Sequence, residues 1–299
     1  MGRNTKIKHL SSRLNLTVFE VFDVPVVVYE DHRTLLQVLF YIRKNRIFPT
    51  PINVVYLDRH SDCNDPKASL DSCSKMRDEE CDLESSWSFV EWDCSVQDHD
   101  WLKTGMDCKL IADALSIGRE SVSNLLETGT ITNLTDRFGG NHNYAISPNI
   151  WHALSLGGVF FRSKDNKWKE WMSSLGWDTS TGSFSGPPTQ PFILDIDLDL
   201  IAHEFDGPPA RPDRPNDHKG HIAAWPEHVI RGFLHRKPHG SQITACDWLR
   251  QMVARASCVT IARESAWCGG FTESQKILDI LDADIFDGGL SRDFPAFAS

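Results

Sequence analysis

Three short apolar runs in this chain lead directly into acidic or histidine residues. The runs and the residues that follow them are 24–29 with Asp31 and His32, 53–57 with Asp58, and 192–194 with Asp195. Short runs of this kind, rich in valine, isoleucine and leucine, are typical of strands buried inside a sheet. A helical pattern at 33–45 separates the first two runs, and alternation of strand and helix favours parallel pairing with right-handed crossovers. We therefore expect an α/β fold with a mostly parallel sheet.

The rest of the chain extends this pattern. Further elements are expected as a strand at 17–22, a helix at 241–256, a strand at 258–262 that leads to Glu264, and a last helix that starts with the capping-box spacing of Thr272 and Gln275. The polar, tryptophan-rich stretch 63–103 is expected to form loops and short helices, and the proline-rich segment 207–220 a surface loop. We interpret residues 1–299 as one domain.

Composition narrows the range of partners. With 41 acidic and 31 basic residues the formal net charge is −10, which argues against nucleic acid because phosphate binding needs a concentrated positive surface. An acidic surface suits a cationic substrate, although solubility alone also explains it. No apolar run approaches the length of a membrane span and no signal-type stretch follows the basic N-terminus, so we expect a cytoplasmic protein that binds no membrane. The sequence leaves the oligomeric state open, a homo-oligomer included.

Cysteine usage argues against a structural zinc site. The chain has eight cysteines but no Cys-x-x-Cys pair, the spacing that such zinc sites use. We expect these cysteines to be free thiols. Five of them fall between Cys63 and Cys108, and the sequence gives no reason for that concentration.

The charged residues after the apolar runs are spaced two apart. They form Asp58-x-His60-x-Asp62 and Asp195-x-Asp197-x-Asp199, with His32 after the first run. Because alternate positions of an extended segment point the same way, Asp58, His60 and Asp62 can face one spot, and so can Asp195 and Asp197. The carboxyl ends of parallel strands also share one edge of a sheet, where ligands collect. We therefore expect these side chains to converge at that edge.

Several carboxylates at one spot do not all stay ionised without compensating charge. Two divalent cations would supply that charge, and mixed carboxylate and imidazole ligands suit manganese, iron or zinc, with the oxygen donors favouring manganese. The alternative is that the acidic segments are solvated turns. Because each segment directly follows a buried-type strand, we favour the metal site, with the ligands His32, Asp58, His60, Asp62, Asp195 and Asp197.

These motifs resemble those of the arginase–deacetylase superfamily, which in order are Gly-Gly-Asp-His, Asp-Ala-His-x-Asp and Asp-x-Asp. The matching segments here are Tyr29-Glu30-Asp31-His32, Asp58-Arg59-His60-Ser61-Asp62 and Asp195-Ile196-Asp197. Segments 194–199 and 260–263 also resemble the divergent branch that contains peptide arginases, which convert arginine residues within peptides to ornithine residues. The resemblance runs in order along most of the chain, but only through these motifs. The chain departs from the pattern where it lacks the two glycines and where Asp199 comes one residue early without a following proline.

The resemblance implies a three-layer α/β/α fold with two Mn²⁺ ions at the carboxyl edge of the sheet. It implies that Asp58 and Asp195 bridge the ions, that His32 and Asp62 complete one coordination sphere, and that His60 and Asp197 complete the other. A water activated by the cations would attack the guanidinium carbon. Asp62 would orient this water and accept its proton, and the products would be urea and an ornithine side chain.

Two further residues are catalytic candidates. Glu264 follows the strand 258–262, where arginases place a glutamate that pairs with the guanidinium through two parallel hydrogen bonds; the alternative is a surface glutamate. His142 would be a proton shuttle, or else a structural loop histidine.

The substrate implied by the resemblance is an arginine-containing peptide. Trp87 and Trp92 lie in a long acidic stretch suited to a groove that admits a chain, and the loop 207–220 would form one wall of it. The alternatives are a small-molecule ureohydrolase acting on free arginine or agmatine, a deacetylase-like amidohydrolase, and a catalytically silent metalloprotein that binds peptides.

Overall fold

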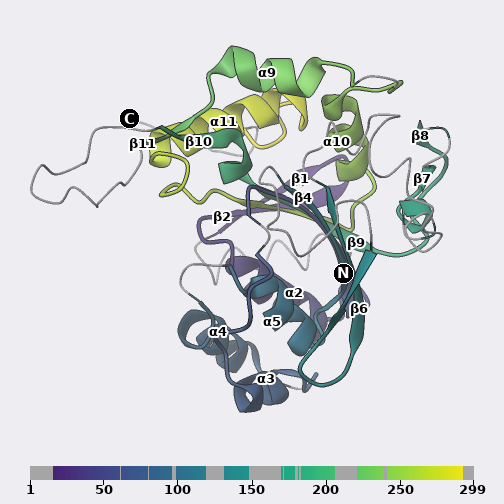
Figure 1. Cartoon of the computed structure of the whole chain (residues 1–299), viewed down its shortest axis with the longest axis vertical. Coiled ribbons are helices and arrows are strands. Elements are labelled where there is room, and N and C mark those ends of the chain that lie inside the picture. The colour runs from purple at the N-terminus through teal and green to yellow at the C-terminus, as the bar shows by residue number, and fades with distance from the viewer. Residues whose placement is uncertain are drawn as a thin grey trace, which may run out of the picture.

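The computed structural model describes residues 16–60, 62–79, 81–95, 99–118, 131–147, 170, 172–178, 181, 183–205, 221–238 and 241–291. In these ranges the chain is built around a sheet of eight strands (Figure 1). From one edge to the other the strands are β1 (Thr17–Val21), β2 (Val24–Tyr29), β12 (Cys258–Ala262), β9 (Phe192–Asp197), β3 (Ile52–Asp58), β4 (Ile111–Gly118), β6 (Asn141–Ser147) and β5 (Ile131–Thr135). The edge strands β1 and β5 run antiparallel to their neighbours and the strands between them are parallel. The predicted mostly parallel sheet is confirmed.

Helices cover both faces of this sheet (Figure 1). One face carries α2 (Thr34–Lys44), α3 (Leu70–Met76), α4 (Leu83–Trp92) and α5 (Trp101–Asp107), and the other carries α9 (Glu227–His235), α10 (Ala245–Val253) and α11 (Phe271–Asp284). Each layer has its own hydrophobic core, and side chains of β2 alternate between the two, with Val26 and Val28 in one core and Val27 and Tyr29 in the other. This alternation is what a strand buried on both faces requires. The three-layer arrangement is confirmed.

Shorter elements complete the described chain. They are the pair β7 (Trp177–Asp178) and β8 (Ser183–Phe184), the 3₁₀ helix η1 (Leu198–Ile201), and the pair β10 (Ala202–Phe205) and β11 (His221–Ala224). η1 follows β9 directly, so it lies at the carboxyl edge of the sheet. The predicted proline-rich loop 207–220 lies outside the described residues. Within the described ranges, none of the helices is long and apolar enough to cross a membrane.

The apolar patterns located the central elements, but one strand is longer than its apolar run. The strands predicted at 24–29 and 258–262 are β2 and β12, and the helix predicted at 33–45 is α2. β9 continues past 192–194 to include Asp195 and Asp197, which are both buried. Two acidic residues inside a central strand need partners, because burying a carboxylate alone is costly.

The predicted cap of the last helix is wrong. Thr272 lies inside α11, whose N-cap is Gly270 without a side-chain cap. The capping box belongs instead to α10, where the Thr244 hydroxyl accepts from the Asp247 amide and the Asp247 carboxylate accepts from the Thr244 amide. The spacing at 272–275 therefore matched a capping motif without forming one.

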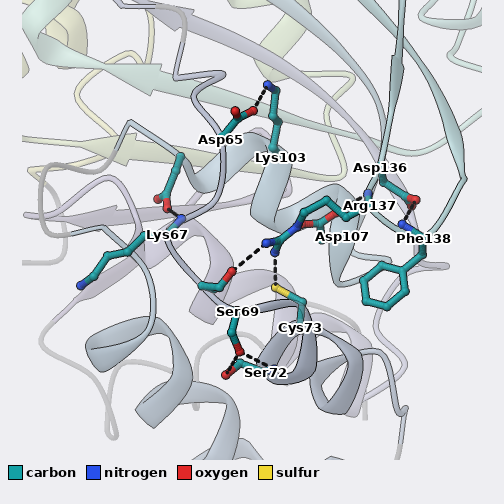
Figure 2. Close-up of polar contacts among 12 residues, drawn as sticks. Asp65, Lys67, Ser69, Ser72, Cys73, Lys103, Asp107, Asp136, Arg137 and Phe138 are labelled. Carbon is teal, nitrogen blue, oxygen red and sulfur yellow. Dashed lines mark hydrogen bonds and ion pairs between the residues drawn. The ribbon is translucent and has the colours of Figure 1, made fainter.

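The cysteine-rich stretch packs into the helical layer that contains α3 and α5, and all eight cysteines are free thiols as predicted. Arg137, in the turn between β5 and β6, ties this layer together (Figure 2). Its guanidinium donates to Asp107 Oδ2 at 2.6 Å, to the Ala68 carbonyl at 2.9 Å and to Cys73 Sγ at 3.1 Å. A hydrogen bond from the Cys108 thiol lowers the pKa of Cys73, burial opposes this effect, and the charge of Arg137 lowers the pKa further.

Candidate metal centre

Neighbouring strands bring most of the predicted site residues to one edge of the sheet. β2 leads to His32, β3 ends at Asp58, β9 ends at Asp197 and β12 leads to Glu264. Because β2, β12, β9 and β3 are adjacent and parallel, their carboxyl ends lie side by side. His32, Asp58 and Asp197 are essentially inaccessible to solvent. The convergence predicted from the motifs therefore occurs in the fold.

The ring of His32 lies among the carboxylates. Its Nδ1 is 3.1 Å from Oδ2 of both Asp62 and Asp197 and 3.5 Å from Asp58 Oδ2. This nitrogen nevertheless has no hydrogen-bond partner among the described residues, because none of these approaches has hydrogen-bond geometry. A buried imidazole nitrogen that faces several carboxylates without bonding any of them is arranged as a metal ligand.

His60 stands on the outer side of the centre. Its Nδ1 is 3.0 Å from Asp199 Oδ2 and 3.7 Å from Asp58 Oδ1. The His60 side chain is 41% exposed, whereas those of Asp58 and Asp199 are buried. Backbone amides fix the carboxylates, since His60 N donates to Asp58 Oδ1 at 2.6 Å and Asp199 N donates to Asp197 Oδ1 at 2.9 Å. The centre therefore opens to solvent on the side of His60.

Within the described chain, three groups of side chains have ligand atoms close enough to hold a metal ion. The groups are His32 with Asp58 and Asp197, Asp58 with His60 and Asp199, and Asp197 with Asp199 and Glu264, each with its atoms within 4.8 Å of one another. Each of the three aspartates belongs to two groups, so one carboxylate can contact two ions. Asp58 Oδ2 and Asp199 Oδ2 are buried without a hydrogen-bond partner among the described residues. Such atoms are costly to bury, and a cation would satisfy them.

Asp195 precedes Asp197 by two residues in β9 and lies further from the carboxyl edge of the sheet. Its carboxylate accepts hydrogen bonds from Tyr29 Oη at 3.0 Å and from Thr260 Oγ1 at 2.5 Å, and its Oδ2 is 2.5 Å from His32 Nε2. It belongs to none of the three groups formed by the described residues. The structure thus places Asp195 behind His32, where a hydrogen bond to Nε2 orients the ring and turns Nδ1 toward the other carboxylates.

A tryptophan that the motifs did not single out holds Asp62. The indole Nε1 of Trp101 donates to Asp62 Oδ2 at 2.6 Å, and the Trp101 ring packs against His32 with centroids 4.9 Å apart. Trp101 is the first residue of α5 and is fully buried. The only hint in the sequence was a tryptophan at the start of a helical stretch, which is far more often a core residue.

Glu264 lies at the same edge in a strained backbone conformation. Its φ is +38°, a region that side-chain-bearing residues rarely adopt. Its carboxylate lies within the group that contains Asp197 and Asp199. Strained residues cluster at functional sites, and here the strain turns a carboxylate toward the centre.

The buried carboxylates hold protons more tightly than ordinary acids. Burial, together with the charge of neighbouring aspartates, raises the pKa of Asp58 well above its usual value and that of Asp197 to about 7. Burial and the charge of Asp197 raise the pKa of Glu264 to about 10. Burial lowers the pKa of His32, but the charge and hydrogen bond of Asp195 outweigh it and raise that pKa well above its usual value. This centre therefore favours the binding of positively charged ligands such as metal cations.

His142 is not brought to the centre. It is the second residue of β6, at the amino end of the parallel strands, whereas the acidic residues gather at the carboxyl end. Its Nδ1 is 2.5 Å from the Ala112 carbonyl and its Nε2 is 3.3 Å from Asp136 Oδ2. Both ring nitrogens thus have structural partners at the opposite edge of the sheet.

No protein-family model matches the chain, and a search of curated proteins also found no match. The assignment of a metal site therefore depends on the arrangement of the side chains. The described chain is an α/β fold whose buried histidine and aspartate groups are suited to metal ions.

Proposed function

We propose that this protein is a two-metal hydrolase that converts arginine residues within peptides to ornithine residues and releases urea. The observation that carries the proposal is a set of buried atoms, His32 Nδ1, Asp58 Oδ2 and Asp199 Oδ2, that converge without hydrogen-bond partners among the described residues. Imidazole nitrogen and carboxylate oxygen together suit manganese, iron or zinc. The motif resemblance to peptide arginases supports the choice of manganese and of the guanidinium group.

The geometry supports a ligand set shifted by one aspartate from the one the motifs suggest. We assign His32, Asp58, Asp62 and Asp197 to one ion, and Asp58, His60, Asp197 and Asp199 to the other. In this scheme Asp199 replaces Asp195 as a ligand, and Asp195 orients His32. Asp58 and Asp197 would help to hold both ions in this scheme.

The surrounding side chains support this reaction. When bound, a pair of divalent cations supplies a water activated for attack at neutral pH. Burial raises the pKa of Asp62, but the nearby His32 outweighs burial and lowers it. Asp62 is therefore ionised and held by Trp101, and it would orient the water and accept its proton. We leave His142 out of this scheme, since both of its nitrogens are engaged at the far edge of the sheet.

Glu264 is the partner we assign to the guanidinium. Its carboxylate stands beside Asp197 and Asp199 and is only partly buried, so a ligand arriving from solvent can reach it. A guanidinium presents a planar fork of N–H donors that matches a carboxylate in two parallel hydrogen bonds. Burial and the charge of Asp197 raise the pKa of Glu264, and the positive charge of bound cations and of the guanidinium would offset both and ionise the carboxylate.

A groove between α3 and α4 supports a peptide rather than a free amino acid. Its volume is about 650 Å³, and its lining includes the acidic Asp82, Glu84 and Asp93, the basic Lys75, and Trp92. Trp92 is 76% exposed, which is unusual for a side chain of this size. Aromatic and acidic side chains together suit a peptide that carries arginine.

The test is urea release from an arginine-containing peptide by manganese-loaded protein, with the arginine-to-ornithine mass loss measured on the same sample. We expect both signals, and their loss on chelation or in Asp58→Asn. We also expect faster hydrolysis of the peptide than of free arginine or agmatine at equal concentration. A preference for free arginine would instead support a small-molecule ureohydrolase.

A further inference from the structure

Trp267 is an exposed aromatic residue beside the metal centre. Its side chain is 46% exposed, and its ring packs edge-on against His60 with centroids 6.4 Å apart. It lies three residues after Glu264, and its amide donates to the Glu264 carbonyl at 2.8 Å. One turn thus carries a carboxylate that faces the centre and an aromatic ring at its open side.

This turn is held in place on several sides. The amides of Arg263 and Glu264 donate to the carbonyls of Tyr29 and Glu30, which extends the pairing of β12 with β2. The buried thiol of Cys268 donates to the Arg263 carbonyl at 3.3 Å. Trp267 therefore projects from a fixed support, and a ligand stacked on its ring would not have to order a loop first.

Among the described residues, Trp267 differs from the exposed phenylalanines in what lies over its ring. In the described ranges, the guanidinium of an arginine lies over each exposed phenylalanine ring, with Arg250 over Phe22 at 5.9 Å, Arg77 over Phe138 at 4.1 Å and Arg263 over Phe271 at 4.0 Å. Among the described residues no cation lies over the ring of Trp267. Tryptophan is the aromatic residue that attracts cations most strongly, so this ring is suited to a cation that comes from outside the chain.

We propose that Trp267 is the residue that selects the substrate class of this centre, by stacking a flat, delocalised cation against its ring while Glu264 supplies the opposite charge. A guanidinium is planar and weakly hydrated and stacks on aromatic faces, whereas an ammonium is compact and strongly hydrated. The site therefore accepts guanidinium side chains in preference to lysine. The inference rests on the proposed function, but it concerns binding and is measurable without turnover.

The test compares binding and turnover in manganese-loaded full-length protein. The probes are blocked tripeptides with a central arginine, lysine or citrulline, where citrulline keeps the shape of arginine without its charge. Calorimetry gives the dissociation constants, and urea release gives kcat and KM. For wild type we expect the arginine peptide to bind about tenfold more tightly than the other two.

Variants of Trp267 separate the effect of losing the aromatic ring from the effect of disturbing the fold. Trp267→Ala and Trp267→Leu should weaken binding of the arginine peptide and raise its KM about tenfold, with kcat changed little and lysine-peptide binding unchanged. Trp267→Phe should keep most of the affinity. Phe22→Ala is the matched control, since Phe22 is 42% exposed but lies at the opposite edge of the sheet. Metal content and thermal unfolding verify that each variant is intact.

The outcomes distinguish this inference from the proposed reaction. If the intact Ala and Leu variants bind the arginine peptide as tightly as wild type does, Trp267 is not the selecting residue, whether or not urea is released. If the variants lose the preference for arginine while wild type releases no urea, the selecting role stands and the hydrolysis is wrong. Failure of wild type to bind the arginine peptide overturns both.

Discussion

Asp195 and Asp199 differ in what their carboxylates touch, and their substitution should therefore affect metal binding differently. Asp199→Asn should remove one of two bound manganese ions, because Asp199 contributes to the group that contains His60. Asp195→Asn should keep both ions but weaken affinity about 10- to 100-fold, because it loses only the partner that orients His32. Manganese titration followed by metal analysis measures both effects. Loss of a full ion in Asp195→Asn would restore Asp195 as a ligand.

Glu264→Gln keeps the shape of the side chain and removes its charge. Substrate binding should weaken by roughly one to two decades, the worth of a charge-assisted pair, while metal content stays normal. The KM for the arginine peptide is the measurement. Loss of a metal ion would instead make Glu264 a ligand, and unchanged kinetics would shift the guanidinium partner to Glu84 or Glu91.

The residue types at the centre were readable from the sequence, but the choice between neighbouring aspartates was not. The alternation Asp195-x-Asp197-x-Asp199 puts all three on one side of an extended segment. Which of them reaches the edge depends on where β9 ends relative to its neighbours, and Asp195 pairs in register with Thr260 and Tyr56 inside the sheet. A shift of β9 by two residues relative to its neighbours leaves the alternation in the sequence unchanged. It nevertheless moves one aspartate away from the carboxyl edge, so that it could no longer contact the metal.

At the scale of elements, the turn between β12 and α11 should be sensitive to Gly269. Its φ is +92°, and a Cβ there would lie 2.2 Å from the Ile222 carbonyl oxygen of β11. Gly269→Ala should therefore displace the turn, lower the melting temperature and raise the KM for the arginine peptide. Gly288→Ala is the control, since Gly288 has a φ of +70° but a Cβ there would meet only the Ser291 hydroxyl, at 3.8 Å. This variant should lose about 1 kcal/mol of the free energy of unfolding. Equal melting temperatures for the two variants would contradict a fixed turn.

Local patterns predicted the elements with strong periodicity and missed those that depend on tertiary contacts. β2, α2 and β12 are marked by continuous or periodic apolar residues. The hairpin of β5 and β6 carries a turn signal in Gly139-Gly140. Its strands, however, have polar residues at the turn end, where Arg137 and Asp107 bond across layers, so an apolar pattern does not identify them. His142 belongs to that hairpin, which is why its distance from the centre was not visible in the sequence.

For the whole molecule, the acidic centre predicts how stability depends on pH. Carboxyl groups with raised pKa values retain protons in the folded state that the unfolded state releases, so their stabilising contribution is present at low pH and lost as pH rises. For Asp197 this loss extends from its ordinary value of 3.8 to about 7, and the raised pKa of His32 acts in the same direction at higher pH. Metal-free protein should therefore melt at a lower temperature at about pH 8 than at about pH 5.

Bound manganese should remove this fall in melting temperature with rising pH. Ligands must lose their protons to bind a cation, so affinity rises over the same pH range and the loaded protein keeps its stability. Calorimetric melting of metal-free and loaded samples across that range is the measurement. The same slope in both samples would mean that the buried carboxylates do not bind the metal.

Metal analysis of the loaded and desalted protein tests the central claim most directly. Two manganese ions per chain, with urea release from an arginine peptide that disappears on chelation and returns with manganese better than with magnesium, is the predicted result. Asp58→Asn should lose most of the bound metal and of the activity, because the proposed scheme assigns Asp58 to both ions. A single tightly held zinc ion with full activity, or full activity without metal, would contradict the two-metal centre.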